Sequence, residues 1–195
     1  MKNKEDFVGF DSHEYRPIVR TQSIKLLEKI VSQEKPKQIL EIGTFIGYSA
    51  SVMLNSCKDS FVTTIEISKE NATDAEKNLC GEGFGGRFEV VNMDTMEYLE
   101  KNSDKKFDFI FLDGAKGQYF RYLPYLKQML KKGGFLLADD VLFYGLVRSK
   151  EKIAHKHRSL VNNLRKFLQE LENDKDFDTT IFDFENGMSL SKKKI

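Results

Sequence analysis

The sequence predicts a doubly wound α/β fold with a mostly parallel sheet, and three observations lead to it. Apolar runs of strand length alternate with longer segments whose apolar residues recur at helical spacing. The run from Phe109 to Leu112 is continuously apolar, which is typical of a strand buried on both faces of a parallel sheet. Near the end of the sequence, Glu185-Asn186-Gly187 separates two alternating segments and predicts an antiparallel hairpin at one edge.

The expected elements follow this alternation in order. Residues 1–16 are polar and mixed, and we expect them to form an N-terminal arm. Pro36 should end the first helix, Ser68 should cap the third, and Gly133-Gly134 should stop the fifth. We expect helices at residues 17–35, 48–54, 71–79, around 98–99, at 122–130 and at 153–171. We expect strands at residues 39–42, 61–65, 88–91, 109–112, 135–138, 179–184 and 188–192.

Composition places the chain in an ordinary globular class. Its 195 residues suit one domain covering 1–195, with 40% hydrophobic residues, 31% charged residues and a net charge of +1. No overall basic excess indicates nucleic acid, so such binding would need a local patch. Cys57 and Cys80 form no CxxC pair, and no apolar run approaches a signal peptide or the ~20 residues of a membrane span. These features predict a cytoplasmic protein.

Carboxylates follow two of the predicted strands, at the carboxyl ends where ligands bind in α/β sheets. Asp113 comes directly after the central strand, before a small-residue loop that carries Lys116. The next apolar run ends in Asp139 and Asp140. Because the carboxyl ends of parallel strands meet at one edge, we expect these side chains to lie near one another. The alternative is that Asp113 merely caps the following helix.

Three earlier strands also end in acids, and the first is followed by a glycine turn. Glu41, Gly43 and Gly47 form an acid–glycine loop, in which glycine lets the backbone approach a ligand and the next helix offers free N–H groups. Glu66 ends the second strand, where an acid can hold ribose hydroxyls, and Asp94 follows the third. Each acid alone could be a cap or lie in a solvated turn. Together they predict a site for a nucleoside cofactor.

A literal GxGxxG match at residues 81–86 does not predict a nicotinamide dinucleotide site. It lies after a helix and before a strand, whereas the dinucleotide fingerprint needs the reverse context. These glycines are interpreted as a flexible turn, and a nicotinamide oxidoreductase is disfavoured.

Three segments carry a resemblance to a known family. ILEIGTFIGYSA, FLDGAKGQY and ADDVLF resemble the cofactor loop, the metal and base segment, and the second metal segment of the S-adenosylmethionine-dependent O-methyltransferases of the catechol and caffeoyl-CoA type, which use a divalent metal. The resemblance covers roughly residues 17–194. It implies a Rossmann-like class I methyltransferase fold with seven strands, and O-methylation of a metal-chelated hydroxyl. A non-catalytic cofactor-binding module is the alternative from another class.

The resemblance also assigns roles to individual residues. It places the cofactor at Glu41, Gly43, Gly47, Ser49, Glu66, Asp94 and Asp113. In that assignment Ser49 holds the methionine carboxylate, Glu66 the ribose and Asp94 the adenine. It places a divalent metal, expected to be Mg²⁺, at Asp113, Asp139 and Asp140. Lys116 lies where the family keeps its general base; the alternative is a solvated loop lysine.

Two departures from the family pattern concern charge and assembly. Asp140 stands where the family usually has Asn, which adds a negative charge beside the metal. The N-terminal arm is shorter than in the family, where it covers the active site and helps to build a homodimer.

The methyl acceptor is predicted from local similarity and charge. DGAKGQY, VLFYGLV and GMSLSKKK are similar to the bacterial members of the family that methylate 5-hydroxyuridine at the tRNA wobble position, giving 5-methoxyuridine. Within VLFYGLV, Phe143 and Tyr144 are suited to stack on a base. A cluster of cations follows this segment. The cluster contains Arg148, Lys150, Lys152, Lys156 and Arg158, together with His155 and His157. The alternatives are a solvated helix face, and a small catechol-like or caffeoyl-CoA-like acceptor.

Overall fold

A computed structural model describes residue 7 and residues 21–195, so the predicted arm lies outside the described residues except for Phe7. The strands are β1 (Gln38–Ile42), β2 (Phe61–Glu66), β3 (Phe88–Asn92), β4 (Phe107–Leu112), β5 (Leu130–Ala138), β6 (Phe177–Phe182) and β7 (Met188–Lys193). The α-helices are α1 (Thr21–Glu34), α2 (Tyr48–Ser56), α3 (Lys69–Gly81), α4 (Thr95–Lys101), α5 (Tyr119–Met129) and α6 (His155–Asn173). A short 3-10 helix, η2 (Lys116–Gln118), precedes α5.

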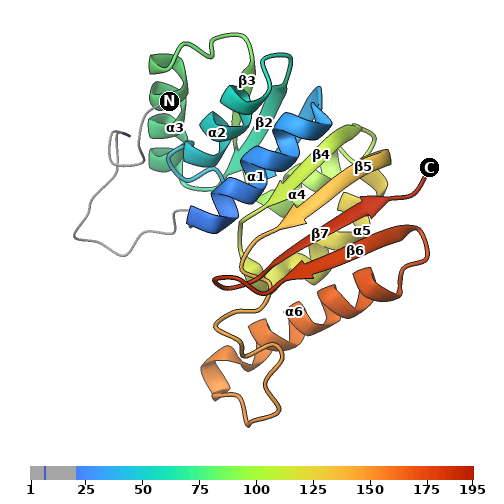
Figure 1. Ribbon diagram of the computed structural model, residues 1–195. Helices are drawn as coiled ribbons and strands as arrows, with labels where there is room; N and C mark the ends of the chain where they lie inside the picture. Colours follow the sequence, from blue (N-terminus) through green and yellow to red (C-terminus); the bar gives the residue numbers. More distant parts are fainter. Residues whose placement is uncertain (1–6, 8–20) are drawn as a thin grey trace.

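The seven strands form one sheet in the order β3-β2-β1-β4-β5-β7-β6 (Figure 1). Strands β1 to β5 pair in parallel, and β7 pairs antiparallel with both β5 and β6. This confirms the predicted doubly wound, mostly parallel sheet with an antiparallel C-terminal hairpin. The hairpin forms one edge of the sheet as predicted. Its first strand, β6, is the edge strand, and β7 lies between β5 and β6.

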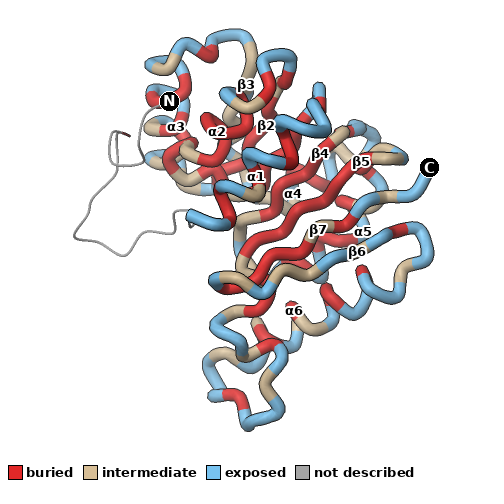
Figure 2. Tube along the Cα trace, in the orientation of Figure 1, coloured by how far each residue is buried: buried red, intermediate tan, exposed pale blue. Residues whose placement is uncertain are grey.

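The two faces of the sheet bury separate apolar cores. One core contains side chains of α1, α2 and α3, and the other contains side chains of α4, α5 and α6. Strand β4 contributes to both, because Phe109 and Phe111 belong to the first core and Ile110 and Leu112 to the second. The central strands are buried along most of their length (Figure 2). The apolar run from Phe109 to Leu112 is therefore continuous because β4 is buried on both faces of the sheet, as predicted.

The predicted helix stop at Gly133-Gly134 is wrong. Gly133-Gly134 was expected to stop α5, but α5 ends at Met129 and both glycines lie inside β5. The pairing of β4 with β5 shifts register between Phe107 and Phe109, opposite this part of β5. A Cβ on Gly134 would lie 2.7 Å from the carbonyl oxygen of Asp108, so the glycine allows the two backbones to approach closely.

The same argument explains a glycine at the carboxyl ends of the strands. Gly43 follows β1 with φ +99°, and a Cβ there would lie 2.4 Å from the carbonyl oxygen of Asp113 after β4. The absence of a side chain lets the loops after β1 and β4 touch. No helix within the described residues is long and apolar enough to cross a membrane.

Candidate active site

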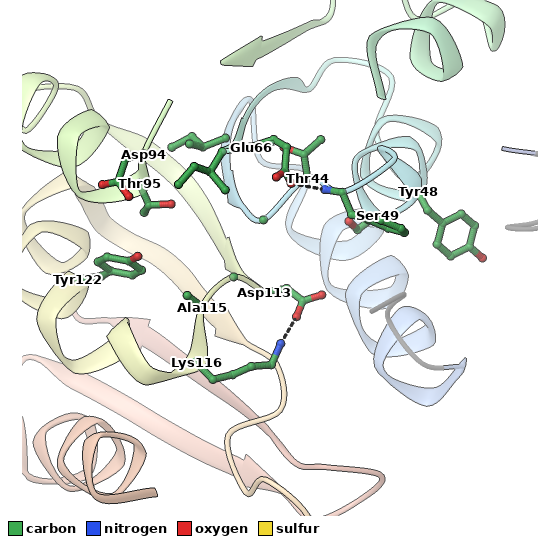
Figure 3. Close-up of a pocket in the computed structure, with 15 residues that line it drawn as sticks. Thr44, Tyr48, Ser49, Glu66, Asp94, Thr95, Asp113, Ala115, Lys116 and Tyr122 are labelled. Carbon is green, nitrogen blue, oxygen red and sulfur yellow. Dashed lines mark hydrogen bonds and ion pairs between the residues drawn. The ribbon is translucent and has the colours of Figure 1, made fainter. Parts of the chain in front are cut away.

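A cavity of about 280 Å³ opens at the carboxyl ends of β1, β2 and β4, where the sequence predicted a ligand site. Its walls include Gly43 and Ser49 from the β1–α2 region, Glu66 from β2, and Asp113 and Lys116 from the loop after β4. In Figure 3, Asp94, Thr95 and Tyr122 lie on one side, Thr44 and Ser49 on the other, and Asp113 and Lys116 between them. The predicted nucleoside site and the predicted metal and base segment therefore share one cavity.

Among the described residues, those that line this cavity do not include Glu41. The residue is fully buried, and its carboxyl accepts hydrogen bonds of 2.5 Å from Ser49 Oγ and Thr64 Oγ1. Burial, the largest effect, raises the pKa of Glu41 to about 8. In this structure Glu41 lies beneath the loop and is hydrogen-bonded to Ser49, which does line the cavity, so its predicted role in cofactor binding stays a prediction. Gly47, with φ +85°, is likewise part of the turn rather than of the wall.

Glu66 and Asp94, the acids predicted at the ends of the second and third strands, do reach the cavity. Glu66 accepts backbone N–H hydrogen bonds from Phe45 and Ser68, each 2.8 Å long, which fix its carboxylate at the cavity edge. Asp94 lines the cavity and also caps α4, because its Oδ1 accepts from the N–H groups of Met96 and Glu97. Asp94 therefore has both predicted roles: it caps the N-terminus of α4 and it lines the cavity.

Lys116 forms ion pairs with two of the three predicted metal ligands. Its Nζ lies 2.9 Å from Asp113 Oδ1 and 3.4 Å from Asp140 Oδ2. Its side chain is only 17% exposed, so Lys116 is not a solvated loop lysine. Burial alone would lower the pKa of this ammonium, but the surrounding negative charges, those of Asp113 and Asp140 among them, raise it. In this arrangement Lys116 is a cation rather than a ready base.

The three aspartates carry more negative charge than Lys116 neutralises. Burial, followed by the charges of Asp113 and Asp140, raises the pKa of Asp139 to about 7. Burial also raises the pKa of Asp113 despite its ion pair with Lys116. Like charges raise one another's pKa because each disfavours ionisation of the next. A further cation at this edge would relieve the repulsion.

The aspartates do not already form a metal-binding arrangement. Within the described part of the chain, no three His, Cys, Asp or Glu side chains are grouped to hold a metal ion. Asp113 and Asp140 face the Lys116 ammonium, whereas Asp139 Oδ1 accepts from Ser23 Oγ and from the N–H of Asp140. The predicted ligands are therefore gathered at one edge but do not converge. Their chemistry nevertheless suits a hard divalent cation, because all three are carboxylates.

The basic cluster lies on and before the start of α6, outside the cavity. Lys150, Lys152, Lys156 and Arg158 are exposed, and α6 has no acidic residue in its first turn and no side-chain cap. Arg148 pairs with Asp183. Basic side chains at a helix start are opposed by the helix dipole, so this cluster is not there to stabilise α6.

An arginine on α6 holds the VLFYGLV loop, residues 141–147, which precedes this cluster in the sequence. Arg165 donates to the carbonyl oxygens of Leu146, Val147 and Ser149. Phe143 and Tyr144 both have positive φ, 40° and 54°, which is strained for aromatic residues. The Phe143 ring packs edge-on against Tyr144 and against His157, and Tyr144 is 61% exposed.

Sequence reasoning missed several residues of the site. Thr95 and Tyr122 line the cavity from the starts of α4 and α5, and Tyr48 lines it from α2. The ring of Phe7 packs edge-on against Tyr48 with centroids 5.5 Å apart, so this residue of the predicted arm contacts the cavity wall. Thr95 and Tyr122 lie in no quoted motif, and their only signal is the folding of distant segments onto the same strand ends; Tyr48 lies within ILEIGTFIGYSA but was not singled out.

The sheet order and the acids at successive strand ends define a Rossmann-like α/β protein with a ligand cavity at the carboxyl edge. The family model for O-methyltransferases matches residues 12–194, and the chain belongs to this O-methyltransferase family.

Relatives and solved structures agree with this assignment. The chain is 26% identical over 184 residues to tapetum-specific methyltransferase 1 of Arabidopsis thaliana, covering 92% of this chain and 78% of the relative. It is 32% identical over 128 residues to catechol O-methyltransferase of Sus scrofa, covering 62% of this chain and 69% of the relative. A candidate caffeoyl-CoA O-methyltransferase from Staphylococcus aureus superposes with a TM-score of 0.83 at 29% identity, covering 91% of this chain and 85% of that one.

A further solved structure shares the fold at lower identity. The O-methyltransferase TomG from Streptomyces achromogenes, solved in complex with S-adenosylmethionine, has a TM-score of 0.81 at 23% identity and covers 91% of this chain and 82% of that one.

Proposed function

We propose that this chain transfers the methyl group of S-adenosylmethionine to a hydroxyl group. The observation that carries the proposal is the single cavity in which Ser49, Glu66 and Asp94 lie beside Asp113 and Lys116. Glu66 is held by two backbone amides and presents a carboxylate suited to ribose hydroxyls. Ser49 and the start of α2 are suited to the methionine carboxylate. Family membership and the relative solved with S-adenosylmethionine support this cofactor.

We propose that Asp113, Asp139 and Asp140 hold a divalent cation, with Mg²⁺ preferred by an all-oxygen donor set. Such an ion lowers the pKa of a bound hydroxyl and orients it. Lys116 Nζ could receive the hydroxyl proton only as the neutral amine, so its ammonium would first have to lose a proton to solvent and give up its ion pairs with Asp113 and Asp140. The acceptor oxygen forms a bond to the methyl carbon while the carbon–sulfur bond breaks, leaving a neutral thioether. Holding the two reactants in line contributes much of the acceleration.

For the acceptor we propose 5-hydroxyuridine at the wobble position of tRNA. The exposed cations before and at the start of α6 are suited to phosphates. The exposed Tyr144, with Phe143 beside it, is suited to stack on a base. The similarity of DGAKGQY, VLFYGLV and GMSLSKKK to the tRNA-modifying members supports the same acceptor.

A small hydroxylated aromatic is the second candidate acceptor, and the comparisons favour it. The catechol O-methyltransferase of Sus scrofa and the candidate caffeoyl-CoA O-methyltransferase of Staphylococcus aureus are both named for such acceptors. The basic cluster is compatible with the phosphates of a coenzyme A thioester as well as with RNA.

Binding of the cofactor is tested by thermal unfolding. S-adenosylmethionine or S-adenosylhomocysteine should raise the melting temperature, because a ligand that binds only the native state stabilises it by about 2.7 kcal/mol at a concentration of 100 times its Kd. NAD should leave the melting temperature unchanged. Stabilisation by NAD, with none by S-adenosylmethionine, would contradict the proposed methyltransferase.

The acceptor is tested by reversing charge in the basic cluster. Lys156→Glu combined with Arg158→Glu should raise the KM for hydroxyuridine-containing tRNA and reduce the salt dependence of binding by roughly one unit of slope per lost phosphate contact. Lys25→Glu combined with Lys29→Glu, at exposed positions of α1, is the matched control. Methylation of a free catechol should barely change in either variant.

The readout is mass spectrometry of tRNA nucleosides after incubation with labelled cofactor. An enzyme that methylates catechols but never produces 5-methoxyuridine would rule out the tRNA acceptor and leave the small aromatic in its place.

A further inference from the structure

Ser23 is a buried polar residue in the first turn of α1, 1% exposed, and its hydroxyl lies between two carboxylates. Its Oγ is 3.1 Å from Asp139 Oδ1 and 2.9 Å from Glu185 Oε2. The three residues come from α1, from the end of β5 and from the turn between β6 and β7. Segments far apart in the sequence thus meet at the carboxyl edge of the sheet.

The two carboxylates have different roles toward Ser23. Glu185 accepts hydrogen bonds from the backbone N–H groups of Gln22 and Ser23 as well as from the hydroxyl, so it anchors the start of α1 to the hairpin. Asp139 has no such contact with the backbone of α1 among the described residues. The hydrogen bond from Ser23 to Asp139 is therefore not needed to hold the helix in place.

That hydrogen bond determines which oxygen of Asp139 remains available. Both bonds to its carboxylate, from Ser23 Oγ and from the N–H of Asp140, reach Oδ1. Within the described part of the chain no hydrogen bond reaches Oδ2. The Ser23 hydroxyl has one proton, which it shares between Asp139 and Glu185, whereas the N–H of Asp140 donates to Asp139 alone. Both donors engage Oδ1, so together they favour one orientation of the carboxylate and leave the other oxygen for a ligand.

We propose that Ser23 is a positioning residue that orients the Asp139 carboxylate toward the divalent cation. This inference rests on the proposed metal role of Asp139. Residues that hydrogen-bond metal ligands orient them, and their loss typically weakens metal binding or activity by about 10- to 100-fold. Ser23 acts without touching the cofactor or the acceptor.

The test compares Ser23→Ala with three other variants. Ser32→Ala is the matched control, because Ser32 lies on the same helix and, among the described residues, its hydroxyl bonds only to the carbonyl of Lys29. Glu185→Gln weakens the anchor of α1 but leaves the Ser23 hydroxyl free to donate to Asp139. Ser23→Thr keeps a hydroxyl at the position. The readouts are the Kd for Mn²⁺ by titration calorimetry, kcat, the KM for S-adenosylmethionine, and the melting temperature.

Ser23→Ala should weaken Mn²⁺ binding and lower kcat by about 10- to 100-fold while leaving the KM for S-adenosylmethionine near that of the unmodified enzyme. Ser23→Thr should recover much of this loss, and Ser32→Ala should lose nothing. Glu185→Gln should lower the melting temperature without an equal loss of Mn²⁺ affinity. Unchanged Mn²⁺ affinity and kcat in Ser23→Ala, or an equal loss in Glu185→Gln, would overturn the positioning role.

Failure of the metal proposal gives a different result. In that case the unmodified enzyme binds no Mn²⁺ and turns over in excess chelator. The positioning role is then decided by kcat alone: Ser23→Ala should lower kcat when Asp139 is present, and should lower it no further in an Asp139→Ala background, which has no side-chain acceptor for the Ser23 hydroxyl. Equal losses in both backgrounds would show that Ser23 acts independently of Asp139.

Discussion

Lys116→Ala should lower kcat by roughly 10²–10⁴-fold, the usual contribution of a general base, while the KM for S-adenosylmethionine changes little. The side chain is nearly buried and its Nζ faces Asp113 and Asp140. Lys116→Arg keeps the positive charge but provides no group that accepts a proton near neutral pH, so it should also be slow. Single-turnover kinetics with saturating cofactor is the appropriate measurement, because it isolates the chemical step.

Two controls separate proton transfer from charge balance. Lys77→Ala removes an exposed lysine that pairs with Asp74 on α3, and it should leave kcat unchanged. Melting temperatures of the Lys116 variants should be recorded, since alanine leaves Asp113 buried without its cation. If Lys116→Arg retains full activity, Lys116 provides charge alone and another group accepts the proton.

Glu41→Gln should change how stability depends on pH. The folded carboxyl has a pKa of about 8 against an ordinary value of 4.5, so between these values the folded state holds a proton that the unfolded state has lost. The contribution of Glu41 to stability is therefore complete below the ordinary pKa and falls as the pH rises toward the folded pKa. The slope is at most about 1.4 kcal/mol per pH unit, which amounts to several kcal/mol over the window. Glutamine does not titrate, so its variant should lose less stability as the pH rises.

The measurement is urea unfolding of both proteins from about pH 5 to pH 8, compared as a difference. Asp113 and Asp139 also have raised pKa values and are present in both proteins, so the difference reports the titration of Glu41 together with its interaction with the charge of Asp113. Glu76→Gln, at an exposed position of α3, is the control. Parallel pH profiles for the Glu41 variant and the unmodified protein would show that Glu41 is ionised when folded.

Much of the fold was predictable because its signals are local. The apolar run at 109–112 and the Asn-Gly turn at 186–187 each determine a nearby structure. The insertion of β7 between β5 and β6 was not predictable, because either strand of a hairpin can pair with the sheet. Gly133-Gly134 was misread because a glycine that stops a helix and one that allows two strands to approach look alike in sequence.

The candidate site divides in the same way. Acids at the last residue of a strand or just after it, such as Glu66 and Asp113, reached the cavity as predicted from topology alone. Glu41 lies one residue before the end of β1, and its side chain is packed inside the protein. Ser23 and Tyr122 reach the site only because distant helices begin there, and a pattern within one segment cannot show that.

The position of β7 has a consequence for synthesis on the ribosome. Strand β7 is made after β6 but lies between β6 and β5, so β5 can gain its second neighbour only after β6 has been made and the chain has turned back. Until then the nascent chain presents one edge of β5 unpaired, beside a row of apolar side chains. Translation pauses in this region would therefore prolong exposure of an aggregation-prone edge. Glu185, in the turn before β7, also becomes available to the start of α1 only at this late stage.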